Sequence, residues 1–313
     1  MLSHLTDDRL YITDAGIETV LIFHHGIDLP CFASFPLLEN EKHTQVMRSY
    51  FEEFIATARR HDLGMLIDTP TWRASSRWGE QLGYSSSDLV EINRRAVMLA
   101  QEIREAHARD NIPIVISGCI GPRDDAYAPE IVPSADDAEA YHLPQIATLA
   151  EAGVDMITAL TLTNVGEAIG IVRASQRVGV PVAISFTVET DGRLPSGQSL
   201  REAVEQVDAE TDSGPAYFMI NCAHPSHFAD ALDDGPWLER IRGLRANASK
   251  KSHEELDAAE ELDEGDPVEF GADYRDLFER LPNLTLLGGC CGTDHRHVSE
   301  ACSACVPVFS EAR

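Results

Sequence analysis

The stretch "LTLLGGCCG" (284–292) places two glycines and two adjacent cysteines directly after a short apolar run. A run of this length followed by glycine is typical of a buried strand that ends in a sharp turn. Adjacent cysteines rarely form a disulfide with each other, because their Cβ atoms point apart. Either Cys290 and Cys291 lie incidentally in a buried turn, or both sulfurs face one ligand at the end of a strand.

Seven similar apolar runs precede this stretch. They are "LYITDAG" (10–16), "LGMLIDTP" (63–70), "IPIVISGCIG" (112–121), "VDMITALTLT" (154–163), "VPVAISFTVE" (180–189), "AYFMINCA" (216–223) and the weaker "IRGLRANAS" (241–249). Segments with helical periodicity separate most of these runs. Eight strand candidates that alternate with helices predict a single α/β domain, a (β/α)8 TIM barrel, with an open doubly wound sheet as the alternative.

The predicted barrel domain spans residues 1–313, with no internal repeat and no low-complexity linker. TIM barrels contain about 250 residues, and more where loops carry insertions, so this length fits one domain. The acidic, weakly patterned segment 249–273 is expected to be a surface insertion made of a helix and a loop. Pro144 lies inside a predicted helix and is expected to kink or break it.

The chain is strongly acidic, with 52 aspartates and glutamates against 25 lysines and arginines and a formal net charge of −27. Such a surface repels nucleic acid and anionic membranes, so neither is an expected partner. No apolar run approaches the roughly 20 residues of a membrane span. The first residues also lack the basic start and apolar block of a secretory signal. These features predict a cytoplasmic protein and leave homo-oligomerisation open.

Chemistry in a TIM barrel lies where the strands end. Polar and sulfur-bearing residues gather at the ends of the predicted strands: Asp14, Asp68, Thr69, Thr71, Ser117, Cys119, Asn221, Cys222, Cys290 and Cys291. This common location is consistent with one shared site.

The cysteines at the ends of the sixth and eighth strands define a candidate metal site. Cys222 ends the sixth strand, and Cys290 and Cys291 end the eighth, so all three should approach one another across the seventh. Three thiolates and one open position are typical of catalytic zinc, and thiolates favour zinc over magnesium or calcium. Zinc would remove the proton of a bound substrate thiol, whose ordinary pKa is about 8.5. Buried cysteines also act as small hydrophobic residues, and spacing alone leaves both interpretations open.

Two segments together resemble the zinc-dependent homocysteine S-methyltransferase family, which includes enzymes that use betaine or S-methylmethionine. These segments are "INCAHP" (220–225) and "GGCCGTDHRH" (288–297). The resemblance continues along nearly the whole chain through "TDAGIETVL" (13–21), "DTPTWRAS" (68–75), "ISGCIGPRDDAY" (116–127) and "ISFTVETDGRLPSGQSL" (184–200). It implies an S-methyltransferase of methionine biosynthesis.

The resemblance also implies roles for individual residues. Cys222, Cys290 and Cys291 would bind Zn2+, and Asn221 would orient the site beside the metal as a catalytic residue. A second set would contact the amino-acid portion of the thiol substrate: Asp14, Ala15 and Gly16, with Thr69 or Thr71 nearby. Asp14 would have a catalytic role as well.

Two positions depart from the family pattern, and the first is the glycine pair after Asp14, which reads Ala15-Gly16 in this chain. Family members carry a glutamate near the end of the fourth strand that holds the homocysteine ammonium, whereas this chain has Leu160 there, followed by Thr161. A leucine cannot pair with an ammonium. The acceptor is therefore either another thiol, or its ammonium contacts Glu18, Asp68 or Glu189 instead.

The methyl donor is not defined by any motif. Trp72, Trp78 and Tyr84 follow the second strand and either form an aromatic box for a sulfonium or quaternary ammonium, or pack a loop over the barrel mouth. Loop packing is the favoured interpretation.

The expected function is therefore zinc-dependent methyl transfer from a small-molecule donor to a thiol, either homocysteine or a related one. Two alternatives remain open. One is a zinc lyase or hydrolase in which the metal activates water, and the other is a non-enzymatic zinc or thiol redox sensor.

Overall fold

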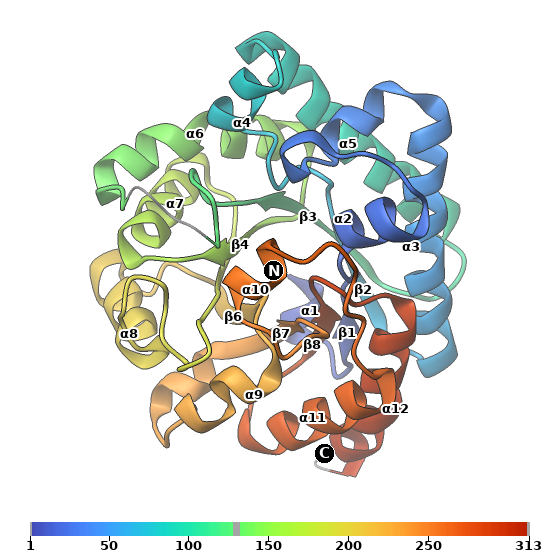
Figure 1. Cartoon of the computed structure of the whole chain (residues 1–313), viewed down its shortest axis with the longest axis vertical. Helices are drawn as coiled ribbons and strands as arrows, with labels where there is room; N and C mark the ends of the chain where they lie inside the picture. Colours follow the sequence, from blue (N-terminus) through green and yellow to red (C-terminus); the bar gives the residue numbers. More distant parts are fainter. Residues whose placement is uncertain (1, 128–131, 312–313) are drawn as a thin grey trace.

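Eight parallel strands close into a barrel in the computed structural model, which describes residues 2–127 and 132–311 (Figure 1). The strands are β1 (Tyr11–Ile12), β2 (Gly64–Asp68), β3 (Ile114–Ile120), β4 (Met156–Leu162), β5 (Val182–Phe186), β6 (Tyr217–Asn221), β7 (Ile241–Ala246) and β8 (Leu286–Gly289). Pairing follows chain order, and β1 closes the barrel on β8 with Tyr11 opposite Leu286. The predicted single-domain TIM barrel is confirmed, including its weak seventh strand.

Helices form a ring around the barrel (Figure 1). The longer ones are α3 (Glu41–His61), α5 (Ser86–Ala106), α6 (Ala135–Ala152), α7 (Val165–Val178), α8 (Leu200–Thr211), α11 (Pro267–Arg280) and α12 (His295–Glu311). Shorter α-helices are α1 (Ser3–Thr6), α2 (Ile17–Thr19), α4 (Ser76–Gln81), α9 (Pro225–Phe228) and α10 (His253–Asp257). Short 3-10 or π turns occupy Val20–His24, Pro30–Phe32, Phe35–Glu39, Ala229–Ala231 and Pro236–Arg240. In the part of the chain that the structure describes, no helix has both the length and the apolarity that a membrane crossing requires.

The ends of these helices follow from local sequence. Ser85 and Ser199 each begin a helix with a capping box, in which the serine side chain and the acidic residue three positions later exchange hydrogen bonds with the backbone. Gly179 ends α7 in the left-handed conformation (φ 78°), which glycine adopts without steric cost. α6 runs through Pro144 without interruption, so this proline does not break the helix.

The amino-terminal half of the barrel interior is apolar. A cluster of buried side chains fills it: Tyr11, Leu66, Val115, Met156, Ala183, Tyr217, Met219 and Leu286. His4 of α1 contacts this cluster through a 3.1 Å hydrogen bond between its Nε2 and the Tyr217 hydroxyl. Chemistry is therefore confined to the opposite end of the barrel, where the strands finish.

A buried ion-pair network occupies the carboxyl-terminal end of the barrel interior. Arg245 of β7 contacts Asp14 (2.8 Å between Nη2 and Oδ1), which follows β1, and Asp68, which ends β2. Its Nε also donates to the Gly289 carbonyl oxygen at 3.1 Å. All three charged side chains are at most 5% exposed. Removal of one partner would leave the others as uncompensated buried charges.

Part of the acidic segment 249–273 lies over the barrel mouth. Figure 1 shows α10 near the centre of the view, above the strand ends. His253 of α10 is buried, and its Nε2 lies 2.8 Å from the carbonyl oxygen of Cys222. The segment beyond residue 266 belongs to α11 in the outer ring.

Replacement of Arg245 by alanine should lower the free energy of unfolding by about 3–5 kcal/mol, because two buried carboxylates lose their cation. Urea denaturation followed by circular dichroism would measure the loss. Arg242→Ala is the matched control, since Arg242 is half-buried at the other end of the same strand. An Arg245→Ala loss no larger than that of the control would contradict a structural role for the ion pairs.

Candidate metal centre and substrate pocket

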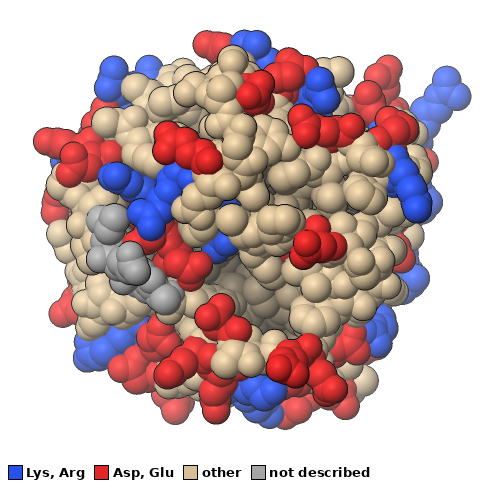
Figure 2. Space-filling view, turned by 45° about the horizontal axis from the view of Figure 1, so that its top comes forward, with Lys and Arg blue, Asp and Glu red and all other residues tan. Residues whose placement is uncertain are grey.

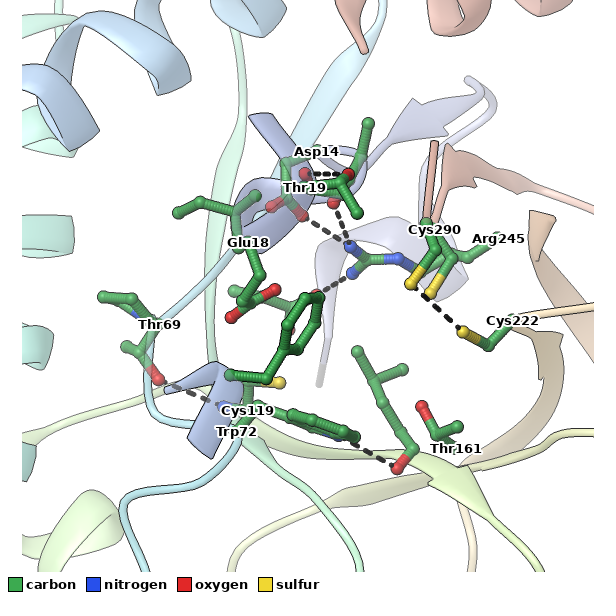
Figure 3. A pocket seen from close by; sticks show the side chains of 18 residues that line it. Asp14, Glu18, Thr19, Thr69, Trp72, Cys119, Thr161, Cys222, Arg245 and Cys290 are labelled. Atoms are coloured by element: carbon green, nitrogen blue, oxygen red, sulfur yellow. Dashed lines mark hydrogen bonds and ion pairs between the residues drawn. The ribbon is translucent and has the colours of Figure 1, made fainter. Parts of the chain in front are cut away.

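Three cysteine side chains converge at the carboxyl end of the barrel. Cys222 directly follows β6, and Cys290 and Cys291 directly follow β8. The three sulfur atoms all lie within 4.8 Å of one another, and Cys222 Sγ is 3.6 Å from Cys291 Sγ. Figure 3 shows the Cys222 and Cys290 side chains pointing toward each other across the pocket. Three soft ligand atoms at this separation could hold one metal ion.

The backbone around the cysteines is held by β7 and by glycines. Cys222 N donates to the Arg245 carbonyl oxygen at 3.0 Å, and Cys290 N donates to the Ala246 carbonyl oxygen at 2.9 Å, so both cysteine backbones extend the ladder of β7. Cys222 adopts a left-handed conformation with φ 58°, which is uncommon for a residue other than glycine and concentrates at functional sites. A Cβ at Gly16 would lie only 2.5 Å from the Cys290 carbonyl oxygen, so the β1 turn can approach the cysteines only with glycine there.

Asn221 connects the cysteine site to the neighbouring strands. Its Oδ1 accepts hydrogen bonds from Thr161 N (2.8 Å) and Ser185 Oγ (2.6 Å). Its Nδ2 donates to Thr161 Oγ1 at 2.8 Å and points to Cys290 Sγ at 3.8 Å. The amide is fully buried. Asn221 therefore fixes the ends of β4, β5 and β6 relative to one sulfur atom.

Tyr127 lies directly over the sulfur atoms. Its hydroxyl is 3.0 Å from Cys222 Sγ and donates to Cys291 Sγ at 3.5 Å. The Tyr127 ring stacks on the His253 imidazole, with centroids 4.2 Å apart and an angle of 8° between the planes. Sequence analysis did not select either residue, although Tyr127 ends the motif "ISGCIGPRDDAY". The loop after β3 and helix α10 together cover this side of the cysteines.

The three cysteine thiols differ in their pKa values. Hydrogen bonds from the Cys222 and Cys291 thiols keep the pKa of Cys290 well below its ordinary value. The hydrogen bonds with Cys290 and Cys291, together with burial, raise the pKa of Cys222. The pKa of Cys291 is raised overall. The hydrogen bond with Cys222 lowers this pKa, but the hydrogen bond with Cys290 and burial together outweigh that effect. Cys290 is thus the cysteine of the cluster that ionises most readily.

A pocket opens in front of the sulfur atoms. Of the residues predicted to contact substrate, those that line it are Asp14, Ala15, Gly16 and Thr69. Thr71 does not line it: its hydroxyl contacts the Cys119 carbonyl oxygen (2.6 Å) and Thr69 Oγ1 (2.7 Å). Most of the predicted substrate residues therefore lie in the same pocket as the cysteines, whereas the Thr71 side chain lies outside this pocket.

The Asp14 carboxylate is already engaged. Besides Arg245, it accepts a 3.2 Å hydrogen bond from the Tyr50 hydroxyl, and that hydroxyl also accepts from Ala15 N at 3.0 Å. Burial raises the pKa of Asp14 to about 7, while Arg245 opposes the rise and the charge of Asp68 adds to it. Asp14 therefore shapes the pocket wall together with Arg245, a residue that sequence analysis did not select.

Leu160 and Glu18 both line this pocket. Leu160 is 7% exposed and presents no charge. The Glu18 carboxylate accepts a 2.8 Å hydrogen bond from Ser34 Oγ, and Figure 3 shows it pointing into the open space of the pocket. Of the other two carboxylates considered for an ammonium, Asp68 lines the pocket beside Arg245, whereas Glu189 lies outside it and contacts His253 Nδ1 at 3.2 Å.

Trp72, Trp78 and Tyr84 do not form an aromatic box. Trp78 is buried, with the Arg73 guanidinium 3.9 Å from its ring centroid. Tyr84 packs against Phe35 and donates to Glu39. Of the three aromatic residues, only Trp72 reaches the pocket, which agrees with the favoured packing interpretation for the other two.

A wider outer chamber of about 350 Å3 lies above the cysteines. Aromatic residues Phe32, Trp72 and Tyr127 line it. Four acidic residues and one arginine line it as well: Asp125, Asp257, Glu261, Asp263 and Arg73, which pairs with Asp125. Figure 2 shows a hollow on this face with acidic side chains around its rim. Both the charge and the aromatic faces favour a cationic ligand there.

A second group of potential metal ligands consists of His24, Glu264 and Asp294. Arg296 contacts both carboxylates of this group, at 3.0 Å and 2.6 Å. The group is thus already neutralised by a cation, which distinguishes it from the cysteine cluster.

Known proteins are similar to this chain over most of its length. The family model described as homocysteine S-methyltransferase matches residues 11–305. Homocysteine S-methyltransferase 1 of Arabidopsis thaliana is 28% identical over 312 residues, which cover 90% of this chain and 89% of that protein. Homocysteine S-methyltransferase of Escherichia coli K12 is 25% identical over 230 residues, which cover 67% of this chain and 72% of that protein.

A solved structure shows the same fold. The homocysteine methyltransferase MmuM from Escherichia coli, in its oxidized form, aligns with a TM-score of 0.73 at 19% identity over 95% of this chain and 96% of that one. Its metallated form aligns with a TM-score of 0.72 at 18% identity, with the same coverage of both chains. Because the family model covers nearly the whole barrel, the chain belongs to the homocysteine S-methyltransferase family and is a methyltransferase.

Proposed function

We propose that this protein transfers a methyl group from a small cationic donor to the thiol of homocysteine, or of a related amino thiol, at a zinc ion. The observation that supports this most directly is the convergence of Cys222, Cys290 and Cys291 at one end of a pocket. The family relatives are named for methyl transfer to homocysteine.

The three cysteine ligands fit zinc. Three cysteine sulfurs within 4.8 Å of one another are soft ligands, which favour zinc over magnesium or calcium. Three protein ligands leave one tetrahedral position for a substrate atom, as in catalytic rather than structural zinc sites. When bound, zinc would hold the acceptor sulfur as a thiolate at neutral pH. The MmuM structure in its metallated form gives a precedent for a metal in this fold.

Residues of this chain would position the reactants. Asn221 holds Cys290 and the ends of three strands in register, so it would keep one ligand at a fixed place. Asp14 would act through Arg245, which fixes the pocket floor. The buried pocket would exclude water and bring the acceptor sulfur and donor carbon together, as required for direct displacement.

The outer chamber would hold the donor. Its volume of about 350 Å3 suits a small molecule. Phe32, Trp72 and Tyr127 offer aromatic faces, and the acidic rim attracts positive charge. A sulfonium such as S-methylmethionine, or a quaternary ammonium such as betaine, matches this chemistry. The inner pocket and the outer chamber share Cys222 and Cys291, so a donor in the chamber lies next to the metal-binding sulfurs.

Family membership favours this activity over the two alternatives from the sequence. A zinc lyase or hydrolase would turn over without a methyl donor. A redox sensor would release metal on oxidation and show no turnover with any thiol. Both alternatives are therefore separated from methyl transfer by one product assay.

Protein purified under reducing conditions should carry about one zinc ion per chain. Cys291→Ala should lose this metal, whereas Cys302→Ala should keep it because Cys302 is buried in α12, away from the cluster. Zinc binding should release protons, because thiols must ionise to act as zinc ligands and the hydrogen bonds with Cys290, together with burial, raise the pKa of Cys222 and Cys291. Metal analysis and calorimetry in buffers of different ionisation enthalpy would measure both quantities. Equal zinc content in the two variants would contradict the cysteine site.

Zinc-loaded protein incubated with S-methylmethionine and with homocysteine labelled in its carbon chain should form labelled methionine, detected by mass spectrometry, while the methionine left from the donor stays unlabelled. Betaine should be tested in parallel as donor, and 4-mercaptobutanoate as acceptor. Cys291→Ala should abolish transfer, while Cys302→Ala should retain it. Turnover of a substrate without any methyl donor would instead indicate the lyase or hydrolase alternative.

A further inference from the structure

Glu18 places a carboxylate without a cationic partner in the wall of the pocket. Its Oε1 accepts from Ser34 Oγ at 2.8 Å, a neutral donor. Within residues 2–127 and 132–311, no lysine, arginine or histidine nitrogen lies within 4.0 Å of its carboxylate. Glu18 is half-buried. A carboxylate that loses part of its water without gaining a counterion is destabilised, so such a group is usually paired, protonated or functional.

The other charges of the pocket do not compensate Glu18. Three carboxylates line the pocket, from Asp14, Glu18 and Asp68, against the single guanidinium of Arg245. Arg245 is committed to Asp14 and Asp68, each of which it contacts directly. Glu18 is thus the one acidic side chain of this pocket that lacks a cation.

Burial is the main cause of a raised pKa at Glu18, the nearby Cys290 adds to the rise, and the Ser34 hydrogen bond and the charge of Arg73 oppose it. Arg73 does not contact the Glu18 carboxylate but forms its ion pair with Asp125. A positively charged ligand in the pocket would compensate the Glu18 carboxylate directly.

We propose that Glu18 binds the ammonium group of the acceptor and so selects an α-amino thiol over a simple thiol. This inference rests on the proposed function. Glu18 would serve where Leu160, on β4, offers no charge to an ammonium. A thiol at the cysteine site would then point its amino group toward the turn after β1.

The other candidate carboxylates fit this role less well. The Asp68 carboxylate is buried beside Arg245, so an ammonium there would compete with an existing ion pair. Glu189 lies outside the pocket and contacts His253. Glu18 combines access to the pocket with the lack of a cation.

Isothermal titration calorimetry on zinc-loaded protein would test the proposal with two thiols. Homocysteine and 4-mercaptobutanoate share the thiol and the carboxylate, but only homocysteine carries an ammonium. The wild type should bind homocysteine about 10-fold to 100-fold more tightly, as expected for a charged hydrogen bond. Glu18→Gln should remove most of this preference by weakening homocysteine binding, while the affinity for 4-mercaptobutanoate stays within about twofold.

Glu189→Gln is the matched control, because it removes the same charge at the barrel mouth but outside the pocket. It should keep the preference for homocysteine. If Glu189→Gln removes the preference and Glu18→Gln does not, the proposal is overturned. Zinc content and thermal midpoint should be measured for each variant, so that loss of folding is separated from loss of recognition.

The wild type alone also gives a decisive result. Equal affinity for the two thiols would overturn the role of Glu18 without touching the proposed function, since a thiol would still bind. Binding of neither thiol to zinc-loaded protein would overturn both the role of Glu18 and the proposed acceptor chemistry. The test therefore does not depend on whether Glu18→Gln folds.

Discussion

The guanidinium of Arg245 joins strands that are not neighbours in the sheet. It contacts Asp14 and Asp68 across the barrel interior and donates to the Gly289 carbonyl oxygen, one residue before the cysteine pair. Its own carbonyl oxygen accepts the hydrogen bond from Cys222 N. Buried ion pairs of this kind contribute little net stability, but loss of one partner is costly. One residue therefore fixes both the floor of the pocket and the backbone of the two cysteine segments.

The predicted contact of Asp14 with the substrate stays a prediction, and the fold shows what else its carboxylate contacts. A free carboxylate after β1 would be a natural ligand for a substrate ammonium. In the structure, however, that carboxylate is held by Arg245 and Tyr50. Glu18, four residues later on α2, reaches the pocket from the same turn and lacks a cationic partner among the described residues. The structure thus separates a structural acid from one that is available to a ligand.

The sequence predicted the barrel because each strand is a short apolar run that ends in polar residues. The seventh run was weak since Arg242 and Arg245 interrupt its apolar pattern, and Arg245 points into the barrel to meet two carboxylates. No pattern in one sequence reports such a pairing, because its partners are 231 and 177 residues away. The contact between Tyr127 and the sulfur atoms is not predictable for a similar reason. Tyr127 lies on a loop, where sequence periodicity does not indicate which way a side chain points.

The three aromatic residues after β2 show the same limit. Trp78 and Tyr84 follow β2 closely in sequence, yet Trp78 stacks on Arg73 and Tyr84 packs on Phe35. The aromatic residues that line the outer chamber come instead from separate loops, with Phe32 before α3 and Tyr127 after β3. Proximity in sequence predicts a shared cluster only where the backbone between the residues is regular.

The proposed metal binding and the proposed acceptor recognition depend on different parts of the barrel. The cysteines depend on β6, β7 and β8, through the backbone hydrogen bonds that continue β7. The carboxylate proposed for the ammonium comes from the turn after β1, and the apolar Leu160 comes from β4. β4 supports the sulfurs through Thr161, which contacts Asn221, and not through the Leu160 side chain. The charge at position 160 can therefore differ while the carboxylate proposed for an amino thiol lies on another wall of the pocket.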